Sequence, residues 1–229
     1  MTARLVVRDL GRRRYGEVLE LQRSLCRQRI SGEVGEDILL LVEHEPVITL
    51  GRGTRAGSLS VPPAELEPRG VELFEVERGG DVTFHGPGQL VGYPIVDLRR
   101  HREDLHWYLR RLEAGLINAL GRLGVHAGPN PGLTGVWSAG RKIASIGIHV
   151  KQWVTFHGFA LNVTTDLSYF DLIVPCGIRG VIMTSVATEL GRVDAARLWD
   201  DTRHSVIEEM GRAFGLDPVD ISQLFESPR

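Results

Sequence analysis

The sequence predicts an α+β protein with a mixed, largely antiparallel sheet and packed helices. The expected strands fall in groups joined by turns, with helices between the groups rather than after every strand. A chain of 229 residues, 42% of them hydrophobic, is long enough to bury about 70% of its surface around one ordinary core. No internal repeat or linker interrupts it. We therefore expect residues 1–229 to form a single domain, with a tail after about residue 215.

The N-terminal half reads as strands with one helix. A strand is expected at residues 5–9, and a helix at 15–30 because Tyr15, Val18, Leu19, Cys26 and Ile30 recur on one stripe. Cys26 is therefore expected in the core. Further apolar runs predict strands at residues 38–43, 47–50, 71–77 and 90–96.

The C-terminal half adds two helices and a hairpin. Leucines at helical spacing predict a long helix over residues 103–123 that packs across the sheet. Strands at 142–150 and 154–163 form an expected antiparallel hairpin that turns near Gln152. The last helix is expected at 195–214.

Composition argues against several classes of protein. A net charge of -2 disfavours nucleic-acid binding. The chain lacks an apolar run near 18 residues and a secretory h-region, so we expect a cytoplasmic protein without a membrane span. Two distant cysteines and eight histidines show no metal-ligand spacing, so no metal site is expected. Residues 51–56 match G-x-G-x-x-A, but Gly57, Pro62 and Pro63 follow instead of a helix, which argues against a dinucleotide site.

Lysine is rare in this chain. Of 27 basic residues, 25 are Arg, and only Lys142 and Lys151 are Lys. A lysine amine can give up its proton when it is desolvated, whereas a guanidinium effectively cannot. Alternation along the expected strand places Lys142 at the start of an apolar row, Ala144, Ile146, Ile148 and Val150. Lys142 is therefore a candidate for chemistry, although it could also snorkel from a sheet edge.

Cys176 lies in Val174-Pro175-Cys176-Gly177-Ile178, where Pro and Gly predict a shaped turn. A free thiol of pKa about 8.5 is a few per cent ionised at pH 7, and a nearby cation raises that fraction. We therefore consider a Cys176/Lys142 dyad that shares a proton near neutral pH. The alternatives are an inert cysteine and a Cys/His pair formed with His85, His149 or His157.

Residues 78–89 contain four glycines together with Arg78, Asp81, His85 and Gln89. Such a bare backbone permits close approach to a ligand, and the polar side chains would contact it. The alternative is a hairpin loop that carries polar side chains, because turns with unusual backbone angles are also rich in Gly and Pro.

Three blocks together resemble one family. RGGDVTFHGPGQLVGYP (78–94), GVWSAGRKIASIGIHVKQWVTFHGFALNV (135–163) and PCGI (175–178) are similar to the lipoyl(octanoyl) transferases, the acyltransferases that begin protein lipoylation. The resemblance spans most of residues 1 to about 215 and leaves the last dozen residues uncovered.

The resemblance implies a fold similar to the catalytic domains of biotin protein ligases and lipoate ligases, and a two-step reaction. Cys176 would accept octanoyl from octanoyl-acyl carrier protein as a thioester. It would then pass the group to a lysine amine on lipoyl domains of 2-oxoacid dehydrogenase complexes and the glycine cleavage H protein. Lys142 matches the lysine that activates the cysteine. The implied substrate-binding residues are Arg78, Gly79, Gly80, Asp81, Val82, Thr83, Phe84, His85, Ser145, Ile146, Gly147, Gly158, Phe159 and Ala160.

The residues agree with this chemistry. Exchange between thioesters is nearly isoenergetic, so neither ATP nor another cofactor is expected. Gly147 and Gly158 would leave space for an acyl chain, and backbone N–H groups near Cys176 and Gly177 are candidates for oxyanion binding. Both protein partners are usually acidic, so steering residues are expected among Arg52, Arg141, Lys151 and Arg179. A monomer is expected.

Three other functions stay open. An ATP-dependent lipoate or biotin ligase would leave the Pro-Cys-Gly turn without a role. A non-catalytic module that binds carrier proteins would function without Cys176. A Cys/His hydrolase would release free octanoate.

Overall fold

The computed structural model describes residues 3–174, 180–191 and 194–222. Its main sheet has eight strands, in the spatial order β11 (Asp217–Asp220), β1 (Arg4–Arg13), β2 (Asp37–His44), β6 (Gln89–Ile95), β10 (Val154–Asn162), β9 (Arg141–Lys151), β8 (Leu133–Ser138) and β7 (Gly128–Asn130). Only the pairings of β1 with β2 and with β11 are parallel. The predicted mixed, largely antiparallel sheet is confirmed.

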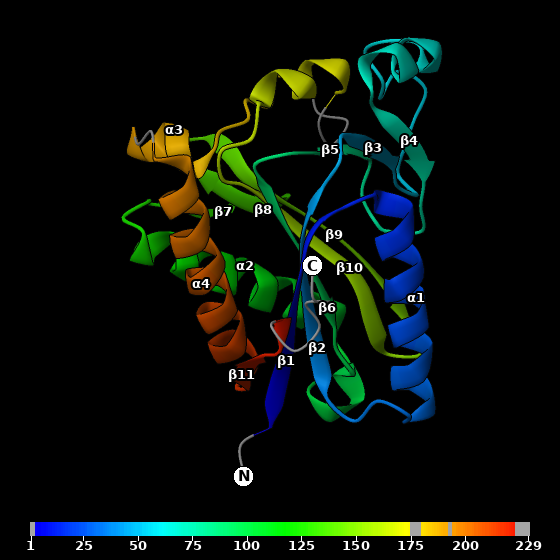
Figure 1. Cartoon of the computed structure of the whole chain (residues 1–229), viewed down its shortest axis with the longest axis vertical. Coiled ribbons are helices and arrows are strands. Elements are labelled where there is room, and N and C mark those ends of the chain that lie inside the picture. The colour runs from blue at the N-terminus through cyan, green and yellow to red at the C-terminus, as the bar shows by residue number, and fades with distance from the viewer. Residues whose placement is uncertain (1–2, 175–179, 192–193, 223–229) are drawn as a thin grey trace, which may run out of the picture.

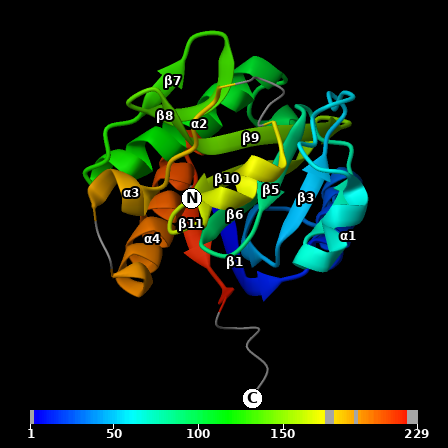
Figure 2. The same cartoon turned by 90° about the horizontal axis from the view of Figure 1, so that it is seen from above.

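A smaller sheet of three strands lies near one end of the large one (Figure 1). Its order is β4 (Glu72–Glu75), β3 (Val47–Leu50) and β5 (Val82–His85). β4 runs parallel to β3 and β5 antiparallel to it. In Figures 1 and 2 this sheet lies on the same side of the molecule as the first helix, away from β7 and β8.

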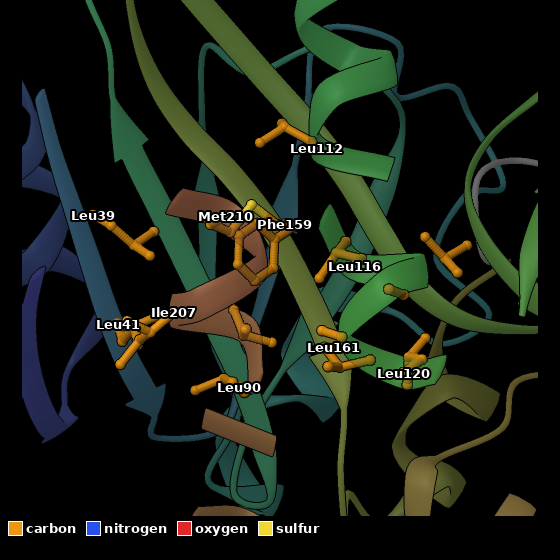
Figure 3. Close-up of a cluster of buried hydrophobic side chains, with 14 of the residues drawn as sticks. Leu39, Leu41, Leu90, Leu112, Leu116, Leu120, Phe159, Leu161, Ile207 and Met210 are labelled. Atoms are coloured by element: carbon orange, nitrogen blue, oxygen red, sulfur yellow. The ribbon is translucent and has the colours of Figure 1, made fainter. Parts of the chain in front are cut away.

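Helices cover both faces of the large sheet (Figures 1 and 2). On one face lies α1 (Tyr15–Ser31), and on the other lie α2 (Leu105–Arg122) and α4 (Ala195–Phe214), with the short α3 (Val186–Leu190) before α4. Alternation along β2 supplies both faces: Leu39 and Leu41 join the core under α2 and α4, whereas Leu40 packs toward α1. Figure 3 shows the first of these cores, where Leu112 and Leu116 of α2 and Met210 of α4 meet Phe159 of β10.

Three helices, α1, α2 and α4, agree with the sequence predictions to within two residues, whereas the short α3 was not predicted. α2 begins at Leu105 because the Asp104 side chain caps it and accepts a hydrogen bond from the Trp107 N–H. α4 ends at Phe214 and is followed by the capping residue Gly215, whose φ of 68° suits glycine. Cys26 is buried in the core beneath α1, as predicted. Among the described residues, no helix is long and apolar enough to cross a membrane.

The strand predictions are less complete. The strand predicted at 71–77 is confined to 72–75, and β5, β7 and β8 were not predicted. β11 lies in the part of the chain expected to be a tail, where it pairs with residues 4–7 of β1. This pairing joins the two ends of the chain, so local sequence patterns carry little sign of it.

Candidate functional site

A pocket of about 240 Å³ lies between the small sheet and strands β8 to β10. One water molecule occupies roughly 10–15 Å³ on this measure, so the pocket has room for a small ligand. It brings together most of the predicted site residues from separate parts of the chain. Those in its wall are Arg78, Gly80, Asp81, Val82, Thr83, His85, Lys142, Ser145, Ile146, Gly147, Gly158, Phe159 and Ala160.

Three predicted residues are not in this wall. Phe84 is buried in the core of the small sheet, where its ring stacks on Tyr169 at 4.6 Å. Gly79 lies behind the pocket and donates its N–H to the carbonyl of Ile148. Cys176 lies outside the described residues, as do Gly177 and Arg179.

The glycines on β9 and β10 have a different purpose from the one predicted. Gly147 and Gly158 face each other across the two strands. A methyl group on Gly147 would lie 3.0 Å from the carbonyl oxygen of Gly79, and one on Gly158 would overlap the Gly92 backbone. Both glycines therefore allow backbone segments to pack closely, rather than leaving empty space for an acyl chain.

Arg78 supplies a buried positive charge beside the pocket. Its guanidinium donates to the Thr49 hydroxyl and carbonyl, with the shortest contact at 2.7 Å, and to the Gly79 carbonyl. The bonds to Thr49 tie the side chain to β3, the central strand of the small sheet. The next residue, Gly79, is bonded to β9 through its N–H, which donates to the Ile148 carbonyl at 2.8 Å.

A chain of hydrogen bonds fixes the tautomer of His85. Asn162 donates its amide N–H to the Thr184 carbonyl, so its Oδ1 accepts from Gln89 Nε2. Gln89 Nε2 also donates to the Phe84 carbonyl, so Gln89 Oε1 must accept from His85 Nδ1, at 2.8 Å. Burial is the largest cause that lowers the pKa of His85, to about 3. The ring is therefore neutral at pH 7, with its proton on Nδ1 and a lone pair on Nε2.

His157 lies within strand β10 but has a backbone conformation that is unusual for a strand. It is 1% exposed and has a φ of 57°, in the left-handed region, while its N–H donates to the Gln22 side-chain oxygen. Its Nε2 lies 3.7 Å from a Glu77 oxygen. Burial lowers the pKa of His157 to about 3. His157 thus forms a neutral, conformationally fixed part of the pocket wall.

Lys142 is 2% exposed and lies in the pocket because β9 bulges. The neighbouring residues Val136 and Trp137 of β8 pair with Ala144 and Lys142, so Ile143 is an extra residue on β9. Ile143 and Ala144 both enter the core. The predicted strict alternation is therefore wrong at this point, although Ile146, Ile148 and Val150 do pack on one core as expected.

Several groups fit around the Lys142 side chain. A methyl group on Gly135 would lie 2.8 Å from Cε and 3.3 Å from Nζ, so glycine is required there. The ammonium lies 5.5 Å from the centre of the Trp137 ring, in cation–π contact. Lys142 N–H donates to the Ile182 carbonyl, and Thr184 N–H donates to the Lys142 carbonyl. The segment 182–184, which follows the Cys176 region in the chain, thus lies against Lys142.

Some residues of the pocket were not predicted as site residues. They are Tyr15, Val91, Tyr93, Gly132, Leu133, Thr134 and Trp137, while His157 was considered only as an alternative partner of Cys176. Trp137 lies only five residues from Lys142, within the second block of resemblance, which was the available signal. Tyr15 comes from the first turn of α1, where it reads as an ordinary core residue and no sequence signal distinguishes it.

The cations predicted to steer partners are separated. Arg52 and Lys151 line a surface groove with Arg23, Arg27, Glu77 and His149. Arg141 lies elsewhere and forms an ion pair with Glu189 at 2.9 Å. Among the cations of the groove, Arg23 is paired with Glu77, whereas Arg27, Arg52 and Lys151 have no ion-pair partner in the described part of the chain.

Comparison with known proteins identifies the family and the fold of this chain. Residues 14–214 match the lipoyl protein ligase A/B catalytic domain. An octanoyltransferase from Nostoc sp. is 48% identical over 199 residues, which cover 87% of this chain and 87% of that protein.

Two solved structures share the fold. A lipoate-protein ligase A bound with ATP superimposes with a TM-score of 0.72 at 17% identity, over 96% of this chain and 88% of that one. A bi-partite lipoate protein ligase from Thermoplasma acidophilum, described with its E2 lipoyl domain, gives a TM-score of 0.66 at 18% identity, over 98% and 89%. The predicted lipoate-ligase fold is confirmed. The chain therefore belongs to the lipoyl protein ligase A/B catalytic-domain family and, within it, to the octanoyltransferases, which are acyltransferases.

Proposed function

We propose that this protein transfers octanoyl from octanoyl-acyl carrier protein, through a thioester on Cys176, to a lysine amine of lipoyl domains. The observation that carries the proposal is the placement of Lys142. A nearly fully buried lysine lines the pocket. Both its backbone N–H and its carbonyl are hydrogen-bonded to residues 182–184, which follow Cys176 in the chain. A buried ammonium favours a neighbouring thiolate, which is the reactive form of cysteine.

The first step exchanges one thioester for another. The Cys176 thiolate forms a bond to the octanoyl carbonyl carbon, and the bond from that carbon to the carrier's sulfur breaks. The carrier leaves as a thiolate and takes up a proton from the Lys142 ammonium, which becomes a neutral amine. Because a C–S bond replaces a C–S bond, the step needs no ATP.

The second step forms an amide. The neutral lysine amine of the lipoyl domain attacks the Cys176 thioester, its nitrogen bonds to the carbonyl carbon, and the C–S bond breaks. The amine loses one proton, which we assign to the neutral Lys142 amine, and the sulfur departs as the Cys176 thiolate. Cys176 and Lys142 are thus restored after each turnover.

The pocket described above is the proposed site for the octanoyl chain. Ile146, Val82, Val91 and Phe159 supply apolar surface, and Arg78 and the neutral His85 border it. The octanoyl chain would lie along the paired strands β9 and β10 and extend away from Lys142. We also propose that the unpaired cations of the groove, Arg27, Arg52 and Lys151, attract the acidic protein partners.

The proposal is tested by transfer to an apo lipoyl domain, followed by its intact mass. With octanoyl-acyl carrier protein and no nucleotide, the domain is expected to gain one octanoyl group on its lysine. Free octanoate with ATP serves as the comparison. Transfer only from octanoate with ATP would overturn the proposal in favour of a ligase, and release of octanoate without acceptor would favour a hydrolase.

A further inference from the structure

Trp137 has a polar atom that the mechanism above does not use. The residue is 7% exposed and lines the pocket. Its indole Nε1–H is buried and makes no hydrogen bond with any group in residues 3–174, 180–191 and 194–222. A buried donor without an acceptor destabilises the folded protein, so native proteins seldom keep one without a use. The indole N–H is therefore available to donate a hydrogen bond to a ligand in the pocket.

The position of Trp137 indicates which acceptor. Trp137 is the cross-strand partner of Lys142, and the Lys142 ammonium lies 5.5 Å from the centre of its ring. In the proposed function, Lys142 serves the nucleophile, so the acyl carbonyl forms and reacts beside it. The acyl carbonyl oxygen is then the nearest acceptor that the reaction brings to this end of the pocket.

Hydrogen bonds on either side of Trp137 fix the chain that carries its ring. The preceding residues are fixed by Gly135, whose N–H donates to the buried Glu113 carboxylate at 3.2 Å. The following residue, Ser138, donates its hydroxyl to the Glu189 carboxylate at 2.9 Å, and its Oγ also lies 2.9 Å from the His126 carbonyl oxygen. A donor held in this way needs little reorganisation when charge develops on its acceptor.

We propose that Trp137 Nε1–H donates a hydrogen bond to the acyl carbonyl oxygen and stabilises the oxyanion in both steps. The inference rests on the proposed function. As sulfur or nitrogen attacks the carbonyl carbon, the C=O electron pair moves to oxygen, which the indole N–H then binds. When the tetrahedral intermediate collapses, the pair returns, the C–S bond breaks and the indole keeps its proton throughout.

Replacing Trp137 by Phe separates the donor from the ring. Trp137→Phe retains an aromatic face for Lys142 but removes the N–H, and Trp199→Phe on α4, outside the pocket, is the matched control. Loss of one oxyanion donor is expected to lower kcat by about 10²-fold with little change in KM. The control is expected to keep the native rate.

Two spectroscopic readouts distinguish a hydrogen bond from a structural role. The thioester C=O stretch of the octanoyl-enzyme is expected at lower frequency in the native protein than in Trp137→Phe. In native protein with ¹⁵N-labelled tryptophan, one of four indole signals is expected to move downfield on acylation, which needs no variant that folds poorly. The other indole signals are assigned with Phe variants of Trp107, Trp153 and Trp199.

The outcomes separate this inference from the proposed function. If the native protein forms no octanoyl-enzyme, the proposed function fails and the inference falls with it. If it does form, but no indole signal moves and the C=O stretch and kcat are the same in Trp137→Phe, the inference alone is overturned.

Discussion

Lys142 shows how a charged side chain is kept in a nearly dry place. A bulge at Ile143 turns it into the pocket, a glycine at position 135 leaves room for its methylenes, and Trp137 offers an aromatic face to its ammonium. Arg could not replace it in the proposed reaction, because a guanidinium effectively does not release a proton. Composition drew attention to both lysines of an otherwise arginine-rich chain, and alternation along the expected strand then favoured Lys142 over Lys151.

Removing the amine is expected to deactivate Cys176. In Lys142→Ala the pKa of the Cys176 thiol should rise toward about 8.5, so alkylation at pH 7 should slow by about tenfold. The measurement is alkylation rate against pH, with the modified cysteine identified by mass. Lys151→Ala, the other lysine, is the control and should alkylate like the native protein. Equal profiles for native protein and Lys142→Ala would refute the dyad.

Glycine at 135 is expected to be needed for activity and not only for stability. A methyl group there would lie 2.6 Å from the Ala144 carbonyl oxygen and 2.8 Å from Lys142 Cε, so Gly135→Ala should displace the amine and abolish most transfer. Gly140→Ala is the control, because Gly140 also has a positive φ, 78°, with nothing within 4 Å. The control should lower Tm by a few degrees and keep its transfer rate. Native transfer by Gly135→Ala would contradict this account of the lysine.

At the scale of elements, the site depends on how separate segments are tied together. A series of hydrogen bonds runs from His85 through Gln89 and Asn162 to Thr184. It joins the small sheet, β6, β10 and the segment beside Lys142. The sequence indicated that Gln89 belonged to a polar set. It could not indicate Asn162 or Thr184, because their partners are 73 and 22 residues away in the chain.

Removing the Asn162 amide from this series of hydrogen bonds is expected to affect both stability and transfer. Asn162→Leu leaves the Gln89 amide and the Thr184 carbonyl without their partner, which should cost about 1–3 kcal/mol in the free energy of unfolding. It should also lower kcat more than it raises KM, because His85 loses its fixed tautomer. Asn118→Leu, at an exposed position of α2, is the control for both denaturation and kinetics. An Asn162→Leu protein with native kcat would show that this series of hydrogen bonds is structural only.

For the whole molecule, the fold class was predicted from the spacing of apolar residues, which reflects the face of each element that is buried. Apolar periodicity gave α1, α2 and α4 because each buries one stripe against the sheet. Strands β5 and β7 are only four and three residues long, and glycine or proline lies in or beside them, so periodicity could not identify them. The parallel pairing of β11 depends on contact between the chain's ends and escapes any local pattern.

The candidate site was predicted from the sequence only in part. The glycine block and the hairpin indicated most of the pocket wall, largely through resemblance to a family. The reason predicted for Gly147 and Gly158 was wrong, since neighbouring backbone occupies the space beside them. Packing in three dimensions decides such details, and a sequence shows only that the side chain is small.

The charge distribution over the whole surface predicts how partners associate. Arg27, Arg52 and Lys151 share one groove, so Arg27→Glu or Lys151→Glu should raise KM for octanoyl-acyl carrier protein by about threefold to tenfold at low salt, with kcat unchanged. The effect should shrink as ionic strength rises. Arg4→Glu, an equal charge change on β1, is the control. If the groove variants and the control behave alike, the groove is not the docking surface.

The most direct measurement for the central claim is the intact mass of the enzyme after incubation with octanoyl-acyl carrier protein without ATP. We predict that the native protein gains one octanoyl group, that an apo lipoyl domain removes it and gains the same mass, and that Cys176→Ala gains none. An octanoyl adduct that persists in Cys176→Ala, or transfer to the lipoyl domain by that variant at the native rate, would contradict the assignment of Cys176 as the acyl carrier.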